Sequence, residues 1–260
     1  MYEMLDAGKL TVFITGATSG FGLATARRFG AAGANVVATG RRLDRLVELQ
    51  NELGPEHCHV AALNVREKGA IEDAIAGLPE PFSRINVVVA NAGLALGLEP
   101  AYEVDIADWE QMIETNVMGL TWTVRALLPG MVARGEGHVV TIGSIAGDFP
   151  YPGGSVYGGT KAFVKQFALN LRADLQGKNV RVTNIEPGMV ETEFSLVRFK
   201  GDDGRADKVY EGMTPMTPED IAESIFWAVC LPRHVNINRI QMMPVEQAFS
   251  PFAVHRGTKA

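Results

Sequence analysis

One stretch near the start of the chain constrains the fold more than any other. Residues 12–15, Val-Phe-Ile-Thr, form an apolar run rich in β-branched side chains, and glycines follow at positions 16, 20 and 22. This order is typical of a buried strand that turns directly into a helix. Because glycine has no Cβ, backbone N–H groups in such a turn can approach an anion, and the start of a helix favours negative charge. The turn therefore predicts a phosphate-binding site for a dinucleotide.

The spacing of these glycines leaves a second interpretation open. They follow the pattern Gly-x-x-x-Gly-x-Gly, whereas the common dinucleotide-binding pattern is Gly-x-Gly-x-x-Gly. Taken alone, the stretch also fits an ordinary turn between a strand and a helix. The choice between the two interpretations depends on residues elsewhere in the chain.

Strands and helices are expected to alternate along the rest of the chain. The expected strands after the first are residues 35–39, 57–63, 85–90, 138–142, 180–185 and 237–242. The expected helices are residues 23–32, 41–53, 66–76, 106–131, 156–175 and a last one that begins at Thr217-Pro218-Glu219. Nearly continuous apolar strands are what a parallel sheet buries on both faces. We therefore expect an α/β fold, a Rossmann-type doubly wound parallel sheet of about seven strands with helices on both faces.

One segment, residues 188–216, breaks this alternation. It is rich in Gly, Asp, Arg and Lys, and a long irregular segment in a compact fold is usually functional. It should emerge at the carboxyl ends of the strands, which is where open parallel sheets bind ligands. We expect a single domain over residues 1–260, with a substrate lid at about 188–216 and a carboxyl-terminal tail at about 244–260.

The composition excludes several classes of protein. The 260 residues are 47% hydrophobic and 21% charged, which is ample for one large core. The net charge of −6 disfavours binding to nucleic acid. The first residues carry acids where a secretory signal has basic residues, and no apolar segment is long enough to span a membrane. We expect a cytoplasmic protein that binds neither nucleic acid nor membranes.

The cysteines indicate neither a disulfide framework nor a metal site. Cys58 and Cys230 are the only two cysteines, and they lie far apart outside any paired-thiol motif. The sequence His57-Cys58-His59 resembles a ligand cluster. However, alternate residues of a strand point to opposite faces, and no further ligands lie nearby in sequence. We expect no metal.

The strongest chemical signal is the pair Tyr157 and Lys161. They are four residues apart at the start of an expected helix, so they share one face, and the strand before that helix leads to Ser144. A nearby lysine favours the phenolate, although lowering a tyrosine pKa from about 10 to about 7 requires roughly 4 kcal/mol. Such a tyrosine could act as an acid or base near neutral pH. Taken alone, the pair also fits an amphipathic surface helix.

Six motifs stand together in an order and spacing that resemble a known family. They are Thr15-Gly16-Ala17-Thr18-Ser19-Gly20-Phe21-Gly22, Asn91-Ala92-Gly93, Asn116, Ser144, Tyr157 with Lys161, and Pro187-Gly188. Along nearly its whole length the chain resembles the short-chain dehydrogenases/reductases. It resembles in particular their NADP-dependent 3-hydroxy acid dehydrogenases, the group of serine and L-allo-threonine dehydrogenase. The marks of that group are Ala38-Thr39-Gly40-Arg41-Arg42, Tyr151-Pro152-Gly153-Gly154, Arg198-Phe199-Lys200-Gly201-Asp202-Asp203-Gly204 and Met242-Met243-Pro244-Val245.

The resemblance implies catalytic roles for four residues. Tyr157 would protonate the carbonyl oxygen during reduction and take the proton back during oxidation. Ser144 would hydrogen-bond the same oxygen as charge develops on it. Lys161 would bind the nicotinamide ribose and lower the tyrosine pKa, and Asn116 would help to hold a water that connects Lys161 to solvent. The hydride would come from the cofactor.

The resemblance also outlines a cofactor cleft. The backbone of Asn91-Ala92-Gly93 would border the adenosine ribose side, and Pro187-Gly188 with Thr192 would face the nicotinamide. Many family members have an aspartate near the adenine where this chain has Asn64-Val65, and the asparagine amide can still donate and accept there. The complete predicted cofactor set is Gly16, Thr18, Ser19, Gly20, Phe21, Gly22, Arg41, Arg42, Asn64, Val65, Asn91, Ala92, Gly93, Tyr157, Lys161, Pro187, Gly188, Val190 and Thr192.

The residues after the second expected strand predict NADP rather than NAD. An NAD site usually has an Asp or Glu there, which accepts hydrogen bonds from the ribose hydroxyl. This chain has Thr39, Gly40, Arg41 and Arg42 instead. Two guanidinium groups attract a 2′-phosphate, which a carboxylate would repel. Alternatively, the two arginines only begin a solvated helix.

The lid suggests how a substrate is held. Glycines at 201, 204 and 212 would let it close, and Phe194 and Phe199 could exclude water. A small hydroxy acid offers its carboxylate, which arginine fits with two parallel hydrogen bonds. We expect Arg198, together with Ser144 and Tyr157, to bind the substrate, with Lys200 as the alternative anchor. A basic lid that only screens the cofactor phosphates would look similar.

The expected function is that of an NADP-linked oxidoreductase. It would interconvert a small 3-hydroxy acid, of the serine, L-allo-threonine or 3-hydroxypropionate type, and the matching 3-oxo acid or semialdehyde. A reductase of a 3-oxoacyl thioester, sugar or other ketone stays open, as does a non-catalytic protein that senses NADP, although Tyr157 and Lys161 favour catalysis. The resemblance also implies a homotetramer built through the helices at 106–131 and 156–175 and through the last strand and tail.

Overall fold

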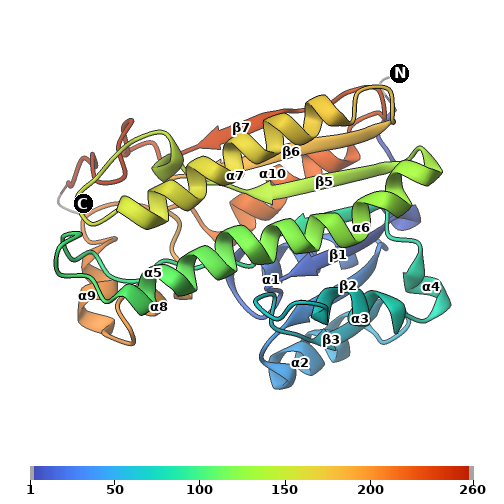
Figure 1. Ribbon diagram of the computed structural model, residues 1–260, viewed down its shortest axis with the longest axis horizontal. Helices are drawn as coiled ribbons and strands as arrows, with labels where there is room; N and C mark the ends of the chain where they lie inside the picture. Colours follow the sequence, from blue (N-terminus) through green and yellow to red (C-terminus); the bar gives the residue numbers. More distant parts are fainter. Residues whose placement is uncertain (1–2, 258–260) are drawn as a thin grey trace.

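Seven parallel strands form one sheet, and their order determines where a ligand can bind (Figure 1). The computed structural model describes residues 3–257. The strand order is β3-β2-β1-β4-β5-β6-β7, which confirms the predicted doubly wound sheet. The order reverses between β1 and β4, and open α/β sheets bind ligands outside the carboxyl ends at such a point. The strands are β1 (Thr11–Thr15), β2 (Asn35–Gly40), β3 (Cys58–Ala62), β4 (Val87–Ala90), β5 (Gly137–Ile142), β6 (Val180–Pro187) and β7 (Arg239–Met242).

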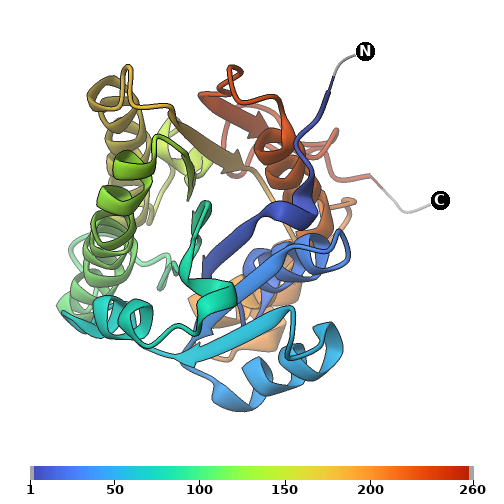
Figure 2. The same cartoon turned by 90° about the vertical axis from the view of Figure 1, so that its right-hand side faces the viewer.

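Helices cover both faces of this sheet. The α-helices are α1 (Gly20–Gly30), α2 (Leu43–Leu53), α3 (Ala70–Ala76), α4 (Glu80–Ser83), α5 (Ile106–Ile113), α6 (Leu120–Arg134), α7 (Ser155–Asp174), α8 (Glu193–Arg198), α9 (Asp203–Lys208) and α10 (Pro218–Cys230). Two short 3-10 helices, η1 (Ala7–Lys9) and η3 (Ile145–Gly147), and a π-helical segment, η2 (Glu114–Gly119), complete the described part. Figure 2 shows α6 and α7 on one side of the sheet and α1 and α10 on the other. None of the helices within residues 3–257 combines the length and apolar character that crossing a membrane requires.

The apolar strands are explained by two separate cores. Val12 and Ile14 of β1 pack in the core formed with α1, α2 and α10, whereas Phe13 packs in the core formed with α3, α6 and α7. All three side chains are fully buried. Because successive side chains point to opposite faces, a strand covered on both faces needs an unbroken apolar run. The two cysteines are buried free thiols, Cys58 in β3 and Cys230 at the end of α10.

The structure differs from the expected elements in three places. The helix predicted over 106–131 is α5, η2 and α6 in succession, so a π-helical segment interrupts it, and it continues to Arg134. The helix predicted over 66–76 begins only at Ala70, because Gly69 before it has a φ of 91°. The segment expected to be irregular, 188–216, contains the short helices α8 and α9. The predictions also missed α4 and the two 3-10 helices.

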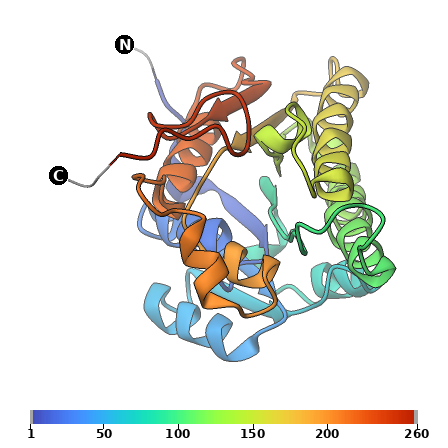
Figure 3. The same ribbon diagram turned by 90° about the vertical axis from the view of Figure 1, so that its left-hand side faces the viewer.

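The segment 188–216 and the tail lie together at the carboxyl end of the sheet, where α8 and α9 appear in orange (Figure 3). The backbone N–H of Gly97 donates to the Arg198 carbonyl at 2.9 Å, and Lys200 pairs with Asp108 at 2.8 Å. From the tail, the Gln247 side chain accepts a 2.8 Å hydrogen bond from the Met189 N–H. These contacts hold α8 and the tail over the sheet edge.

Candidate active site

One cleft of about 260 Å³ opens at the carboxyl ends of the strands, and it gathers most of the predicted site. Of the predicted catalytic residues, Ser144, Tyr157 and Lys161 line it, and Asn116 does not. Of the predicted cofactor residues, all but Gly22 line it. The predicted members in the lining are Gly16, Thr18, Ser19, Gly20, Phe21, Arg41, Arg42, Asn64, Val65, Asn91, Ala92, Gly93, Ser144, Tyr157, Lys161, Pro187, Gly188, Val190 and Thr192. The substrate candidate Arg198 lies just behind this lining.

The glycine turn between β1 and α1 needs glycine for two different reasons. Gly16 and Gly20 have φ values of 69° and 51°, a region that disfavours other residues. Gly22 lies beneath the turn, where a Cβ would collide with the Gly16 carbonyl oxygen and approach Asn91 Nδ2 within 2.6 Å. Asn91 Nδ2 donates to the carbonyls of Thr15 at 2.8 Å and Gly16 at 3.2 Å. Gly22 therefore shapes the cleft without lining it.

Tyr157 and Lys161 of α7 both line the cleft; the lysine is buried, and the tyrosine is partly buried. Lys161 Nζ lies 5.7 Å from the centre of the Tyr157 ring and donates to the Ile142 carbonyl at 2.8 Å. Burial lowers the pKa of Lys161 to about 8. Burial raises the pKa of Tyr157 to about 12, against smaller lowering effects of Arg198 and Ser144. The expected lowering of the tyrosine pKa by Lys161 is therefore not seen in this chain alone, because loss of solvent outweighs the nearby charges.

Ser144 caps the short η3 helix that follows β5. Its hydroxyl accepts a 3.1 Å hydrogen bond from the Ala146 N–H and donates to the Pro187 carbonyl at 3.4 Å. Its hydroxyl lowers the pKa of Tyr157, against the larger effect of burial. The serine hydroxyl is therefore fixed between β5, β6 and α7, at the inner end of the cleft.

Asn116 lies outside the cleft, in the π-helical segment η2, and is almost completely buried. Its side-chain oxygen accepts from the Leu94 N–H at 2.9 Å, and its Nδ2 donates to the Leu94 carbonyl at 2.8 Å and to Thr160 Oγ1 at 3.1 Å. Asn116 therefore ties the loop after β4 to α7, next to Lys161. π-Helical turns occur often at functional sites.

The outer end of the cleft is basic. Arg42 donates from Nε and Nη2 to Thr18 Oγ1 at 3.1 and 2.8 Å, and from Nη2 to Ser19 Oγ at 2.8 Å. Arg42 Nη1 also pairs with Glu193 at 2.9 Å, and Arg45 pairs with the same carboxylate at 2.6 Å. Arg41 is exposed and lines the cleft. Arg45 and Glu193 were not predicted; Arg45 lies in the first turn of α2, three residues after Arg42, which precedes that helix.

Asn64 and Val65 border the cleft near the basic end, as expected. The Asn64 side chain accepts from the Arg66 N–H at 3.2 Å and donates to Glu67 at 3.3 Å. Val65 packs against Gly119 of η2, where an added Cβ would lie 2.7 Å from Val65 Cγ2. Asn64 thus adds a polar amide to this part of the lining, and Val65 adds an apolar surface.

Arg198 lies beside Tyr157. Its guanidinium carbon is 5.2 Å from the ring centres of both Tyr157 and Phe194, and Nη2 donates to the Tyr151 hydroxyl at 3.4 Å. Its Nε is buried and has no hydrogen-bond partner within residues 3–257. The alternative anchor, Lys200, is 58% exposed and pairs with Asp108, so its charge is used away from the cleft.

The residues of the cleft fit a dinucleotide. The glycine turn faces its interior, and Arg41 and Arg42 provide cations at one end, while polar side chains gather at the other. Thr115 also lines the cleft, and its Oγ1 is buried and has no hydrogen-bond partner among the described residues. A buried polar atom without a partner is costly, so a bound group that pairs with it would be stabilised.

Comparisons with known proteins agree with this geometry. A family model described as short chain dehydrogenase matches residues 10–202. The NADP-dependent 3-hydroxy acid dehydrogenase YdfG of Escherichia coli O6:H1 is 56% identical over 248 residues, which cover 95% of this chain and 100% of that protein. Sulfoacetaldehyde reductase 2 of Chromohalobacter salexigens is 53% identical, covering 94% and 98%. The closed form of serine dehydrogenase complexed with NADP⁺ is 55% identical, with a TM-score of 0.91, and the match covers 95% and 99%.

Proposed function

The chain belongs to the short-chain dehydrogenase family, and we propose that it is an NADP-dependent enzyme that interconverts a small 3-hydroxy acid and its 3-oxo acid or semialdehyde. The observation that carries this proposal is the guanidinium of Arg198, whose buried Nε has no partner within residues 3–257, beside the Tyr157 ring of a cleft that also holds Arg41 and Arg42. An anionic small substrate and a phosphorylated dinucleotide would both find complementary charge there.

Residues at the outer end of the cleft would hold the cofactor. The backbone of the turn at residues 16–22 would face its pyrophosphate, and Arg41 and Arg42 would recognise the 2′-phosphate. Asn64 and Val65 would border the adenine, and Pro187, Gly188, Val190 and Thr192 would border the nicotinamide. When bound, NADP supplies or accepts the hydride.

Residues at the inner end would handle the proton and the developing charge. In reduction, the Tyr157 hydroxyl gives its proton to the carbonyl oxygen, while Ser144 donates a hydrogen bond to the same oxygen. In oxidation, the tyrosine takes the proton back. Lys161 lies close enough to stabilise the resulting phenolate and to replace its proton, and Asn116 keeps α7 and the loop after β4 in register with it.

Arg198 would provide the substrate anchor. A guanidinium can form two parallel hydrogen bonds with a carboxylate, and the buried Nε of Arg198 is available for one of them. Phe194, whose ring lies 5.6 Å from that of Tyr157, closes the apolar side of the same pocket. Removal of water by this ring strengthens a charged hydrogen bond in the pocket.

A second candidate function follows from a named relative. The sulfoacetaldehyde reductase from Chromohalobacter is nearly as similar to this chain as the 3-hydroxy acid dehydrogenase. A sulfonate, like a carboxylate, offers more than one anionic oxygen to the N–H groups of an arginine. A short aldehyde carrying a sulfonate is therefore the second substrate to test.

The test compares charged and neutral substrates in Arg198→Ala. Oxidation of L-serine, L-allo-threonine and 3-hydroxypropionate with NADP, and reduction of sulfoacetaldehyde with NADPH, would be compared with reduction of an uncharged aldehyde of similar size. Loss of the anchor should raise the KM for the anionic substrates by about 100-fold or more, since a charge-assisted pair contributes about 3 kcal/mol. The KM for the neutral aldehyde should change little.

Lys200→Ala is the matched control, because it removes one cation from the same lid but from a solvent-exposed position. It should leave the KM of both substrate classes nearly unchanged. Equal losses for charged and neutral substrates in Arg198→Ala would contradict the anchor. Strong activity of the wild type on a bulky 3-oxoacyl thioester or sugar, with none on the small acids, would contradict the proposed substrate class.

A further inference from the structure

A carboxylate lies in a cleft that otherwise attracts anions. Glu193, the first residue of α8, lines the same cleft as the glycine turn and Arg42. Its two oxygens are held separately: Oε2 accepts from Arg42 Nη1 at 2.9 Å, and Oε1 accepts from Arg45 Nη1 at 2.6 Å. An oxyanion bridging two guanidinium groups is the arrangement in which arginines also hold phosphate.

Arg42 and Arg45, which donate to this carboxylate, also donate to the glycine turn that would contact the dinucleotide. Arg42 donates to the hydroxyls of Thr18 and Ser19, and Arg45 donates to the Thr18 carbonyl at 3.4 Å. Among the described partners of Arg42, Glu193 is the one that carries charge. A second anion that reaches Arg42 must therefore displace Glu193 or be repelled by it.

Displacement of Glu193 would cost little. Its side chain is 40% exposed, so the freed carboxylate can return to water. Partial burial raises the pKa of Glu193, but the hydrogen bonds from Arg45 and Arg42 outweigh that effect and lower it. The group is thus a carboxylate at neutral pH. A phosphate dianion carries more charge than this single carboxylate and competes well for the same donors.

We propose that Glu193 is a specificity-determining residue: its carboxylate occupies the phosphate-binding face of Arg42 and Arg45 until the 2′-phosphate of the cofactor replaces it. This inference rests on the proposed use of NADP. The exchange weakens binding of the phosphorylated cofactor but not of its unphosphorylated counterpart, so Glu193 limits the preference for NADP and eases its release.

The experiment measures nucleotide binding by isothermal titration calorimetry, without substrate and without turnover. Adenosine 2′,5′-bisphosphate and adenosine 5′-monophosphate differ only in the 2′-phosphate and are titrated into the full-length wild type and Glu193→Gln. The variant should bind the bisphosphate about three- to tenfold more tightly, the effect expected from two partly exposed ion pairs. Binding of the monophosphate should change less than twofold. The gain should shrink as salt is added.

Glu191→Gln is the matched control. It removes the same charge from the same segment, at an exposed residue that forms no ion pair within residues 3–257. It should leave both affinities unchanged. Glu193→Asp is a second variant whose shorter side chain cannot reach both arginines, and it should give a smaller gain if Glu193→Gln proves unstable in thermal unfolding.

The outcomes separate this inference from the proposed function. If the wild type binds both nucleotides equally, the proposed preference for NADP is wrong and the inference fails with it. If the wild type prefers the bisphosphate but Glu193→Gln leaves that preference unchanged, only the inference is wrong. If Glu193→Gln binds both nucleotides more tightly by the same factor, Glu193 acts by general charge repulsion. If the variant binds the bisphosphate more weakly, Glu193 helps to hold the arginines in place for the phosphate. Either result would contradict the proposal that Glu193 competes with the 2′-phosphate.

Discussion

The Tyr157 hydroxyl is the one acidic proton at the inner end of the cleft that the proposed reaction uses. Tyr157→Phe keeps the ring and its packing against Phe194 but removes that proton. We expect the kcat to fall by about 100-fold or more, which is the usual contribution of a general acid. Binding of NADPH, measured by fluorescence titration, should stay within a few-fold of the wild type.

Tyr151→Phe is the control for this variant, because it removes a second tyrosine hydroxyl nearby, one that accepts a hydrogen bond from Arg198. Its kcat for a neutral aldehyde should remain close to that of the wild type. A Tyr157→Phe enzyme with nearly normal turnover would show that another group supplies the proton.

Lys161 makes stability depend on pH in an unusual direction. Burial lowers its pKa from 10.5 to about 8, so between these pH values the unfolded chain binds the extra proton. The contribution of Lys161 to stability therefore rises as the pH rises through that window, and below about pH 8 the buried charge costs roughly 3 kcal/mol. Lys161→Met removes this cost together with the amine.

Chemical unfolding at pH 7 and pH 10.5 tests this linkage. The free energy of unfolding of Lys161→Met, relative to that of the wild type, should be higher at pH 7 than at pH 10.5, so the variant gains relative stability at the lower pH. The lost hydrogen bond to Ile142 affects both pH values and cancels in that comparison. Lys178→Met, at an exposed position, should show no such difference. A pH-independent difference for Lys161→Met would mean that water reaches the amine.

The spacing of neighbouring residues predicted part of the cleft, and the family resemblance predicted lining residues far apart in sequence, but neither predicted which charged side chains would pair across it. Tyr157 and Lys161 lie one helical turn apart, so their proximity could be predicted. The burial that raises the Tyr157 pKa could not, because it depends on α8 and its Phe194. The pair Arg45 and Glu193 joins positions 148 residues apart, and only the folded chain brings them together.

Helix α7 contains two adjacent glycines with opposite surroundings, which gives a matched pair of substitutions. A Cβ at Gly159 would meet nothing within 4 Å, whereas a Cβ at Gly158 would lie 2.9 Å from the Ala146 carbonyl oxygen. Gly159→Ala should therefore stabilise the protein by about 0.5–1 kcal/mol, or raise its Tm by about 1–4 °C.

Gly158→Ala should lower the Tm and the kcat together. The added methyl group pushes on the η3 turn that Ser144 caps, so the serine hydroxyl shifts relative to Tyr157. Thermal unfolding and steady-state kinetics of both variants check the pair. If both substitutions stabilised the protein without loss of kcat, the close approach of α7 to η3 would not matter for the site.

Strands and helices could be predicted where one hydrophobic pattern ran through the whole element. They could not be predicted where the backbone departed from regular α-helical hydrogen bonding. The seven strands follow from apolar runs, because burial on both faces allows little else. The π-helical segment η2 has no comparable pattern: its residues continue the amphipathic sequence of α5 and α6. It depends on Asn116 bonding to Leu94 and Thr160, which are contacts between elements far apart in sequence.

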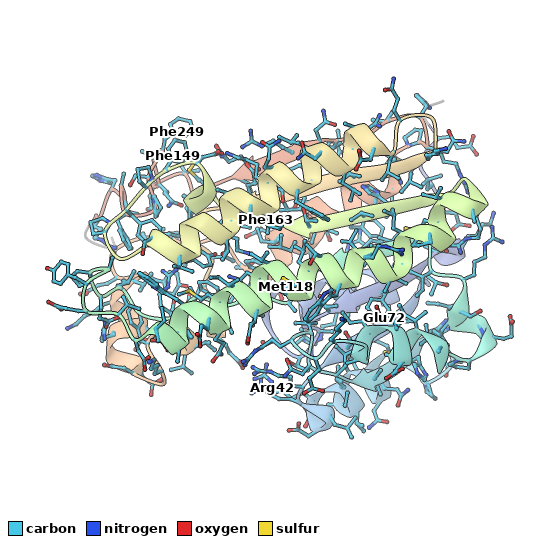
Figure 4. All side chains as sticks on the ribbon, viewed as in Figure 1. Arg42, Glu72, Met118, Phe149, Phe163 and Phe249 are labelled. Carbon is cyan, nitrogen blue, oxygen red and sulfur yellow. The ribbon has the colours of Figure 1, made fainter. Side chains whose placement is uncertain are left out.

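The molecule carries a row of exposed apolar side chains on one helical layer, which supports the predicted homotetramer. Ile113 of α5, Met118 of η2, and Phe163 and Leu169 of α7 are 38–44% exposed. Figure 4 shows Met118 and Phe163 on neighbouring helices of the same face. In a monomer, each of these helices needs only one apolar face, which packs on the core. A second row of apolar side chains on the outer face therefore favours burial by another copy of the chain.

Phe163→Glu tests this face in solution. Its ring stacks on Phe167 with centroids 5.9 Å apart, and a carboxylate there would be costly to bury in a subunit contact. By light scattering at micromolar concentration, the wild type should have a mass near four times 28.1 kDa. The variant should have half that mass, because contacts through β7 and the tail would still hold a pair. Val47→Glu, at an equally exposed apolar position on α2 in the opposite layer, should leave the tetramer intact. A monomeric wild type, or equal dissociation in both variants, would contradict the proposed assembly.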